Sequence, residues 1–254
     1  LVDGPFQGDA SAIDSLVGNA AVVVEGSPLA LREEEYVSSW RWSVPTGLMH
    51  FCLEDADIIS LEESEAKQMA HLAECPQPPL YLRNGRRKVA LPQAQHSSAL
   101  IELMARRRTV RAAATPSITL AQLSDCLFAG MGITGFTQNC VGALPLGMTP
   151  SGGARNPYEA YVFARRVDGL EPGIYHYSAL DHDLGRVGGK LPRFSELVGG
   201  QDWADEMPCL VILVADLNRT MWKYSDPNAY RVVMIEAGHI GQNIMLAATQ
   251  HGLS

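Results

Sequence analysis

The chain has 254 residues, of which 46% are hydrophobic and 19% charged, so it can bury the core of one large domain, alone or with a smaller one. Its formal net charge is −8 and its basic residues gather only in the short runs 86–88 and 106–108, which argues against wholesale binding of nucleic acid. No apolar stretch reaches the roughly 20 residues that span a bilayer, and the first residues do not form a signal peptide, so no membrane association is expected.

The five cysteines lie far apart, without CxxC spacing and in odd number, and the histidines lack a metal-binding spacing. The pattern predicts a cytoplasmic protein with neither a disulfide framework nor a metal site. Because the first residue is leucine, we expect the sequence to be trimmed at its start. The cysteines are Cys52, Cys75, Cys126, Cys140 and Cys209.

The first part of the chain mixes short apolar and aromatic runs. A β-rich run over 20–24 is followed by the aromatic stretch 36–42 and a second apolar run over 48–53. An amphipathic helix is predicted over 61–73, and the prolines at 76, 78 and 79 end it. Asn84-Gly85, between two apolar triplets, predicts a type I′ hairpin turn. The polar residues 92–98 then read as a linker, which places a boundary near residue 97.

Beyond this boundary, helical patterns occupy 100–107 and 119–128. A strand is predicted over 158–164, with a turn at 168–169. A second strand pair is suggested by 173–177 and 210–215, the latter apolar enough to be buried on both faces. The last helix is predicted over 229–250. It contains Gly238 and Gly241, which cost about 1 kcal/mol each relative to alanine and usually let another backbone pack closely.

Residues 130–135 match the spacing GxGxxG of dinucleotide-binding proteins. That fingerprint needs a strand before the glycines and a helix beginning at them, whereas a helical pattern precedes them here. We therefore interpret these glycines as the end of a helix and a loop.

Ser151 could act as a hydrolase nucleophile, with His176 or His239 and Asp216 completing a triad. The nucleophile elbow needs a glycine two positions before the serine, and Thr149 stands there instead. A hydrolase is thus a weak alternative.

Two segments are suited to binding a flat or phosphorylated ligand. Pro150, Ser151, Gly152 and Gly153 form a loop whose backbone can approach a ligand closely, directly before the strand at 158–164. Residues 107–111 offer guanidinium groups and a hydroxyl within one short turn, which suits bidentate phosphate binding. An exposed basic helix end would give the same turn pattern.

The order of the arginine turn, the glycine loop entering a strand, and the glycine-rich helix segment 236–243 resembles the nitroreductase-like flavoprotein family. Within it, residues 169–177 and 222–224 look like the SagB-type branch, the FMN-dependent azoline dehydrogenases of thiazole and oxazole peptide biosynthesis. The resemblance covers roughly residues 98–254.

The resemblance implies an α+β, nitroreductase-like fold with an antiparallel or mixed sheet flanked by helices, preceded by a smaller N-terminal segment. It also implies a homodimer with FMN in the interface, in which the glycine loop reaches the cofactor from the partner subunit. Arg107, Thr109 and Arg111 match the family's phosphate-binding turn. Pro150, Ser151, Gly152 and Gly153 match its loop beside the isoalloxazine ring. Lys223 and Tyr224 match the pair associated with azoline oxidation.

For catalysis we assign Lys223 as the base, because a buried lysine has a lowered pKa, and Tyr224 as its hydrogen-bonding partner; the reverse assignment stays open. The ordinary alternative for this pair is a surface lysine and a packed tyrosine in a strand-to-helix connection. Glu236, His239 and Asn243 form one polar stripe on the last helix, which we expect to face solvent, with His239 as a secondary candidate for the pocket.

The chain departs from the family at two places. It stops at Ser254, where relatives continue, so we expect an incomplete C-terminal end. Arg155-Asn156 stand where SagB relatives tend to carry a histidine, which leaves the substrate open. The segment 1–97 is expected to be an accessory module or a degenerate copy of the catalytic fold.

The expected function is that of an FMN-dependent dehydrogenase acting on an azoline-like or peptide-derived substrate, with biosynthetic partner enzymes. Two alternatives stay open: an NAD(P)H-dependent nitro or quinone reductase, and a flavin-free scaffold that binds partner enzymes.

Overall fold

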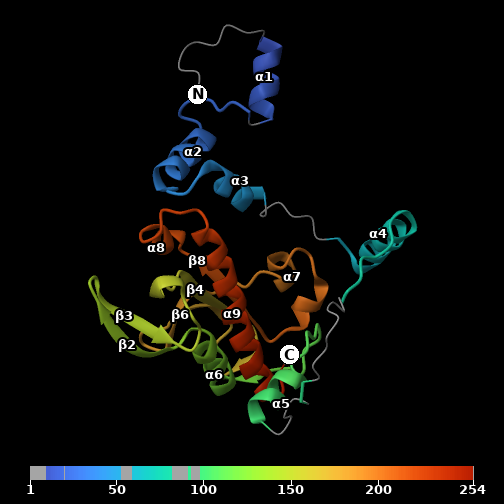
Figure 1. The fold of residues 1–254 in the computed structure, drawn as a ribbon, viewed down its shortest axis with the longest axis vertical. Coiled ribbons are helices and arrows are strands. Elements are labelled where there is room, and N and C mark those ends of the chain that lie inside the picture. The colour runs from blue at the N-terminus through green and yellow to red at the C-terminus, as the bar shows by residue number, and fades with distance from the viewer. Residues whose placement is uncertain (1–9, 20, 53–58, 82–90, 93–97, 254) are drawn as a thin grey trace.

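The computed structural model describes residues 10–19, 21–52, 59–81, 91–92 and 98–253. The first three N-terminal helices lie above one end of a mixed body of sheet and helices, and the fourth lies to one side of it (Figure 1). The long helix α9 (Ala229–Gln250) runs through that body. The N-terminal helices are α1 (Ala10–Gly18), α2 (Pro28–Ser39), α3 (Val44–Cys52) and α4 (Leu61–Glu74).

Among the described residues of the N-terminal part, the regular elements are helices. Helix α4 confirms the prediction over 61–73; Ser60 accepts a hydrogen bond from the Glu63 amide, and the Glu63 side chain accepts one from the Ser60 amide. The strand expected over 20–24 is wrong, because residues 21 and 22 form a bend and residues 23 and 24 have no regular structure. Two of its valines, Val22 and Val24, are largely exposed, and no strand within the described residues pairs with them. The hairpin expected at Asn84-Gly85 and most of the linker lie outside the described residues.

The central sheet has four antiparallel strands in the order β7, β6, β4, β8. Their bounds are β4 (Tyr158–Ala164), β6 (Gly173–Ser178), β7 (Asp183–Gly188) and β8 (Cys209–Ala215). Alternate residues of β4 are fully buried, as expected for a central strand whose side chains point to opposite faces. The predicted pairing of 173–177 with 210–215 is wrong, because β4 lies between these strands.

Strand β8 is also less buried than its apolar sequence predicts. It forms one edge of the sheet, none of its residues is buried, and Val214 is 49% exposed. An apolar run of this kind does not distinguish a central strand from an edge strand.

Two smaller sheets complete the strands. β1 (Ile118–Thr119) pairs in parallel with β5 (Val167–Asp168), and β2 (Ile133–Asn139) pairs with β3 (Gly142–Gly147) in an antiparallel hairpin. The segment 130–135 ends helix α6 (Leu120–Met131), as predicted, but it leads into β2 and not into a loop. The expected turn at 168–169 is present, with Gly169 at a φ of +85°.

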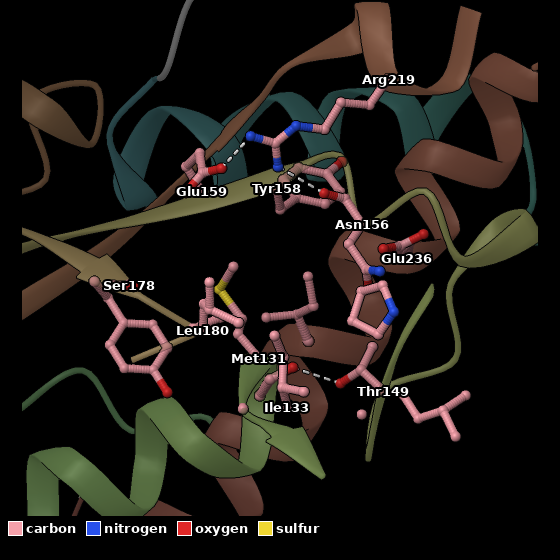
Figure 2. A pocket seen from close by; sticks show the side chains of 18 of the residues that line it. Met131, Ile133, Thr149, Asn156, Tyr158, Glu159, Ser178, Leu180, Arg219 and Glu236 are labelled. Carbon is pink, nitrogen blue, oxygen red and sulfur yellow. Dashed lines mark hydrogen bonds and ion pairs between the residues drawn. The ribbon is translucent and has the colours of Figure 1, made fainter. Parts of the chain in front are cut away.

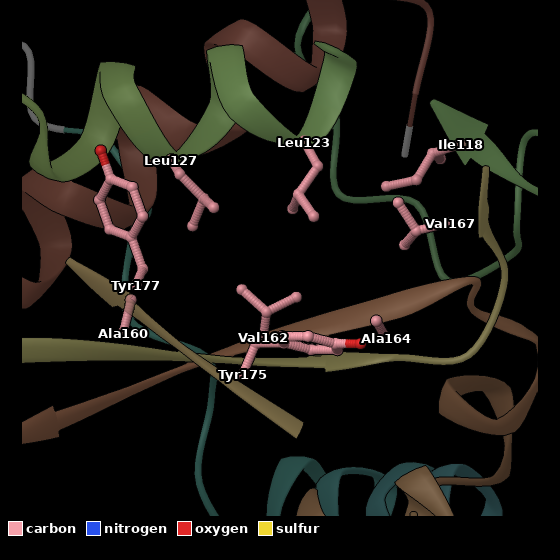
Figure 3. Packing of buried hydrophobic residues seen from close by; sticks show 9 residues of the cluster. All are labelled: Ile118, Leu123, Leu127, Ala160, Val162, Ala164, Val167, Tyr175 and Tyr177. Carbon is pink, nitrogen blue, oxygen red and sulfur yellow. The ribbon is translucent and has the colours of Figure 1, made fainter. Parts of the chain in front are cut away.

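Helix α6 covers one face of the central sheet (Figure 3). Its residues Leu123 and Leu127 are buried against the inward side chains of β4 and β6, among them Val162 and Tyr177. Gly130 allows α6 to approach α9, because a Cβ there would lie 2.6 Å from Ile244 Cγ1. The opposite face is partly covered by α7 (Phe194–Leu197) and the 3-10 helix at Asp202–Glu206.

Helix α9 (Ala229–Gln250) has the predicted bounds, and α5 (Ala99–Arg106) lies close to those predicted. The short α8 (Leu217–Met221) precedes α9, and α8 and α5 lie beside opposite ends of it (Figure 1). Gly238 and Gly241 have no described atom within 4 Å of the position of a Cβ, so no backbone of the described chain packs against them.

Candidate functional site

The glycine loop has an unusual backbone. Gly153 has a φ of +64°, and the non-glycine residues Ala154 and Asn156 also lie in the left-handed region, at +53° and +44°. Such conformations cost energy for residues with a Cβ and cluster at binding sites and active sites. The loop therefore holds a fixed, strained shape at the start of β4.

Side chains behind the loop hold that shape. Ser151 Oγ accepts a hydrogen bond from the Asn156 amide at 2.9 Å, and the Gly152 amide donates to Glu236 Oε2 at 3.2 Å. Two turns of helix farther on, Asn243 donates to Thr149 Oγ1, which donates to the Gly130 carbonyl. The loop is thus tied to α9 and to the end of α6.

These contacts correct the expectation for the polar stripe on α9. Glu236 is 4% exposed and Asn243 is half-buried, and both bind the loop; only His239 of the three is exposed to solvent. Burial raises the pKa of Glu236, although hydrogen bonds from Ser151 and Gly152 and the nearby His239 act in the opposite direction. The stripe supports the loop from behind.

Lys223 and Tyr224 lie in the turn after α8, and their side chains contact the glycine loop. Lys223 Nζ donates to the Gly153 carbonyl at 3.4 Å and lies 5.3 Å from the centre of the Tyr224 ring. A Cβ on Gly153 would lie 2.3 Å from Tyr224 Oη and 2.7 Å from Lys223 Nζ, so only glycine leaves room for both groups. The structure therefore brings together the predicted pair and the predicted glycine loop.

The burial expected for Lys223 is not found in the single chain, where its side chain is exposed. Tyr224 is half-buried. A cavity of about 550 Å³ borders this place, lined by Gly152, Tyr224, Val232 and residues of the first turns of α9. Tyr224 thus stands at the rim of an open cavity, and Lys223 precedes it in the chain.

The arginine turn lies elsewhere. Arg107 is half-buried and Thr109 and Arg111 are exposed, directly after α5. Val110, between them, lines a cavity of about 350 Å³ with residues of the last turns of α9, including Ile244 and Ala248. Gly152 contacts Val232 and Glu236, about twelve residues earlier on the same helix, which is roughly 18 Å along its axis. One chain alone does not bring the arginine turn to the glycine loop.

A further cavity, of about 320 Å³, lies between β2, β3 and the central sheet and is bordered by Thr149, Asn156 and Glu236 (Figure 2). A charged group that the sequence reasoning missed lines one wall: Glu159 binds His176 Nε2 at 2.7 Å and also pairs with Arg219, which donates to the Asn156 carbonyl. Burial by itself would raise the pKa of Glu159, but hydrogen bonds from His176 and Arg219 outweigh it, and the pKa is lowered.

The hydrolase alternative finds no support in this geometry. His176 binds Glu159, Asp216 caps α8 and pairs with Arg219, and the Ser151 hydroxyl accepts from the Asn156 amide and contacts Glu236. In the part of the chain that the structure describes, no group of three or more His, Cys, Asp or Glu residues could hold a metal ion. Among the described helices, none is long and apolar enough to cross a membrane.

The Nitroreductase family model matches residues 104–254. Protein MJ1384 of Methanocaldococcus jannaschii, which is named as a nitroreductase, is 33% identical over 177 residues, or 65% of this chain and 80% of that protein. The trifolitoxin-processing protein TfxB of Rhizobium leguminosarum bv. trifolii is 34% identical over 110 residues, or 41% of this chain and 30% of TfxB. The chain thus spans most of MJ1384 and less than a third of TfxB.

Among solved structures, the E. coli microcin synthetase McbBCD complex with truncated pro-MccB17 bound contains a chain with a similar fold. The TM-score is 0.53 at 19% identity, over 93% of this chain and 84% of that chain. The similarity to TfxB is consistent with the SagB-type branch. Because the family model covers more than half of the sequence and MJ1384 is matched over most of its length, the chain belongs to the nitroreductase family and has the α+β fold expected of it.

Proposed function

We propose that this protein is an FMN-dependent oxidoreductase of the SagB type that oxidises an azoline-like ring in a peptide-derived substrate. The observation that carries the proposal is the convergence of Lys223 Nζ and Tyr224 Oη on Gly153, the loop that matches the isoalloxazine-binding segment. The name of TfxB, a processing protein, supports a peptide substrate and biosynthetic partner enzymes.

The residues present fit FMN if two chains contribute. Gly152 and Gly153 offer a backbone without side chains, and Gly152 borders an open cavity. Arg107, Thr109 and Arg111 offer two guanidinium groups and a hydroxyl at a helix end. The separation of the glycine loop from the arginine turn along α9 supports a site assembled at the interface of a homodimer, with the arginine turn of one chain near the glycine loop of the other. The open surface at Gly238 and Gly241 suits close approach of a second backbone.

Oxidation of an azoline to an azole removes a hydride and a proton from the ring. Bound FMN would supply the hydride acceptor, and the chain must orient the ring carbon and take the proton. Lys223 and Tyr224 are the side chains placed for this, and their ordinary pKa values of about 10.4 and 10 mean that one must stabilise the deprotonated form of the other. We propose Lys223 as the base and Tyr224 as its hydrogen-bonding partner.

The absorption spectrum of the purified protein is the first test. Flavin bands, or bands that return when FMN is added, support the proposal; colourless protein that cannot be reconstituted supports a flavin-free scaffold. Next, Lys223→Ala should leave yellow, FMN-loaded protein that no longer oxidises an azoline peptide. Lys190→Ala, which removes an exposed lysine after β7, is the matched control and should keep full turnover. Unchanged turnover in Lys223→Ala would refute the assignment.

An NAD(P)H-dependent nitro or quinone reductase is the second candidate, because the relative covered over 80% of its length is named as a nitroreductase. The two candidates differ in the direction of electron flow. A reductase oxidises NAD(P)H in the presence of a quinone or nitroarene, whereas a peptide dehydrogenase draws electrons from its substrate. Rapid NADPH oxidation together with inert azoline peptides would replace our proposal with this one.

A further inference from the structure

The segment between α2 and α3 reaches the turn that carries Lys223 and Tyr224. Trp42 is 5% exposed, and its indole Nε1 donates a hydrogen bond to the main-chain carbonyl of Tyr224 at 2.9 Å. A buried indole N–H needs an acceptor, and here the acceptor belongs to the proposed catalytic residue itself. The contact joins positions 182 residues apart in the sequence.

Two more contacts fix the same region. The Arg41 amide donates to Met221 Sδ at 3.4 Å, on the last residue of α8, and His50 Nδ1 lies 2.9 Å from Tyr230 Oη, in the first turn of α9. The Trp42 ring packs edge-on against Tyr230, with centroids 5.8 Å apart. The segment 41–50 therefore holds the end of α8, the start of α9 and the turn between them.

Inside the turn, the amides of Lys223 and Tyr224 both donate to the Thr220 carbonyl. The amide side of the turn is thus bound by α8, and the carbonyl side is bound by Trp42. Because both side chains converge on Gly153, a displacement of this turn moves them relative to the glycine loop.

We propose that Trp42 is a positioning residue for Lys223 and Tyr224, and that residues 41–50 belong to the catalytic unit despite their place in the N-terminal segment. The proposal rests on the proposed function for its catalytic meaning. Its structural content, that Trp42 holds the turn, is testable without any substrate.

The test compares Trp42→Phe, which keeps a buried ring and removes the N–H donor, with Trp40→Phe. Trp40 donates its own indole N–H to the Ser43 carbonyl, within the same segment, and is the matched control. Hydrogen exchange followed by mass spectrometry reports on the amides of 223 and 224. In Trp42→Phe their exchange should quicken roughly fivefold, the population change expected from losing one ordinary hydrogen bond. Exchange in β4 should stay unchanged in both variants.

In turnover of an azoline peptide, Trp42→Phe should lower kcat roughly 10- to 100-fold with little change in KM, as expected from misplaced catalytic groups. Unchanged exchange of 223 and 224 would overturn the positioning role. If the wild type oxidises no azoline peptide, the proposed function fails, while hydrogen exchange still decides whether Trp42 holds the turn. If Trp42→Phe does not fold, Trp42→Leu, which also keeps an apolar side chain and removes the N–H donor, is measured in the same way. Unchanged exchange of 223 and 224 in that variant would overturn the proposal.

Discussion

Gly153→Ala should separate the geometry of the Lys223–Tyr224 pair from the stability of the fold. The new Cβ would lie 2.3 Å from Tyr224 Oη and 2.7 Å from Lys223 Nζ. To restore ordinary contact, the Tyr224 hydroxyl must move by roughly 1 Å, and both side chains have free ends that can do so. We expect the protein to fold and its proposed catalytic pair to be displaced.

The stability cost comes mainly from the backbone. At a φ of +64°, alanine pays about 1–2 kcal/mol that glycine does not, which for a chain of this size lowers Tm by roughly 2–8 °C. Gly169→Ala is the matched control, because Gly169 has a φ of +85° and no described atom within 4 Å of a Cβ. Both variants pay the backbone cost, and only Gly153→Ala displaces Lys223 and Tyr224.

The assay is turnover of an azoline peptide, read beside Tm and flavin content. A displacement of about 1 Å at a reacting group should lower kcat roughly 10- to 100-fold in Gly153→Ala. Gly169→Ala should keep the kcat of the wild type despite a similar loss of Tm. Equal kcat values in the two variants would refute the claim that contact with Gly153 sets the position of the pair.

Two further predictions concern the charged groups around the loop. Burial raises the folded-state pKa of Glu236, so the stability contributed by its neutral form is present below about pH 4.5 and is lost as pH rises through the raised pKa. Relative to the wild type, Glu236→Gln should therefore become more stable as pH rises, measured by urea unfolding between pH 4 and 8. A stability difference that does not vary with pH would contradict this. For Glu159 the pH dependence of stability has the opposite sign, because its pKa is lowered: its contribution is present above pH 4.5 and is lost as pH falls. Glu159→Gln should therefore cost about 1–2 kcal/mol of stability near pH 7 and progressively less in acid. An equal cost at both ends of the pH range would count against the hydrogen bonds from His176 and Arg219 as the cause of the lowered pKa.

The sequence predicted those elements whose pattern is long and regular. The strand over 158–164 and the helix over 229–250 have the predicted bounds, because each carries a sustained period of apolar residues. The valine run at 22–24 has strand propensity, but no strand in the described part of the chain pairs with it, and propensity alone does not make a strand. The hairpin of β2 and β3 was missed because its glycines and Pro145 look like loop residues.

The candidate site was likewise predictable only in part. The loop and the Lys223–Tyr224 pair could be proposed from local motifs, and the structure brings them together. Glu159 and His176 could not be linked, because only the pairing of Tyr161 with His176 across β4 and β6 places these side chains on one face. Alternation along the two strands was a usable signal, but the register between them was not available from the sequence. Glu236 looked solvent-facing because a polar stripe on a helix usually is.

Helix α9 constrains the sequence by its length as well as by its residues. Glu236, Ile240 and Asn243 lie along one face and bind or border the glycine loop and its cavity, while the last turns pack beside the arginine turn. Inserting a single residue between the two ends would rotate one set of contacts by about 100° relative to the other. An exposed position such as Met234 can vary in chemistry at little cost, whereas insertions and deletions within this helix should be rare among functional relatives.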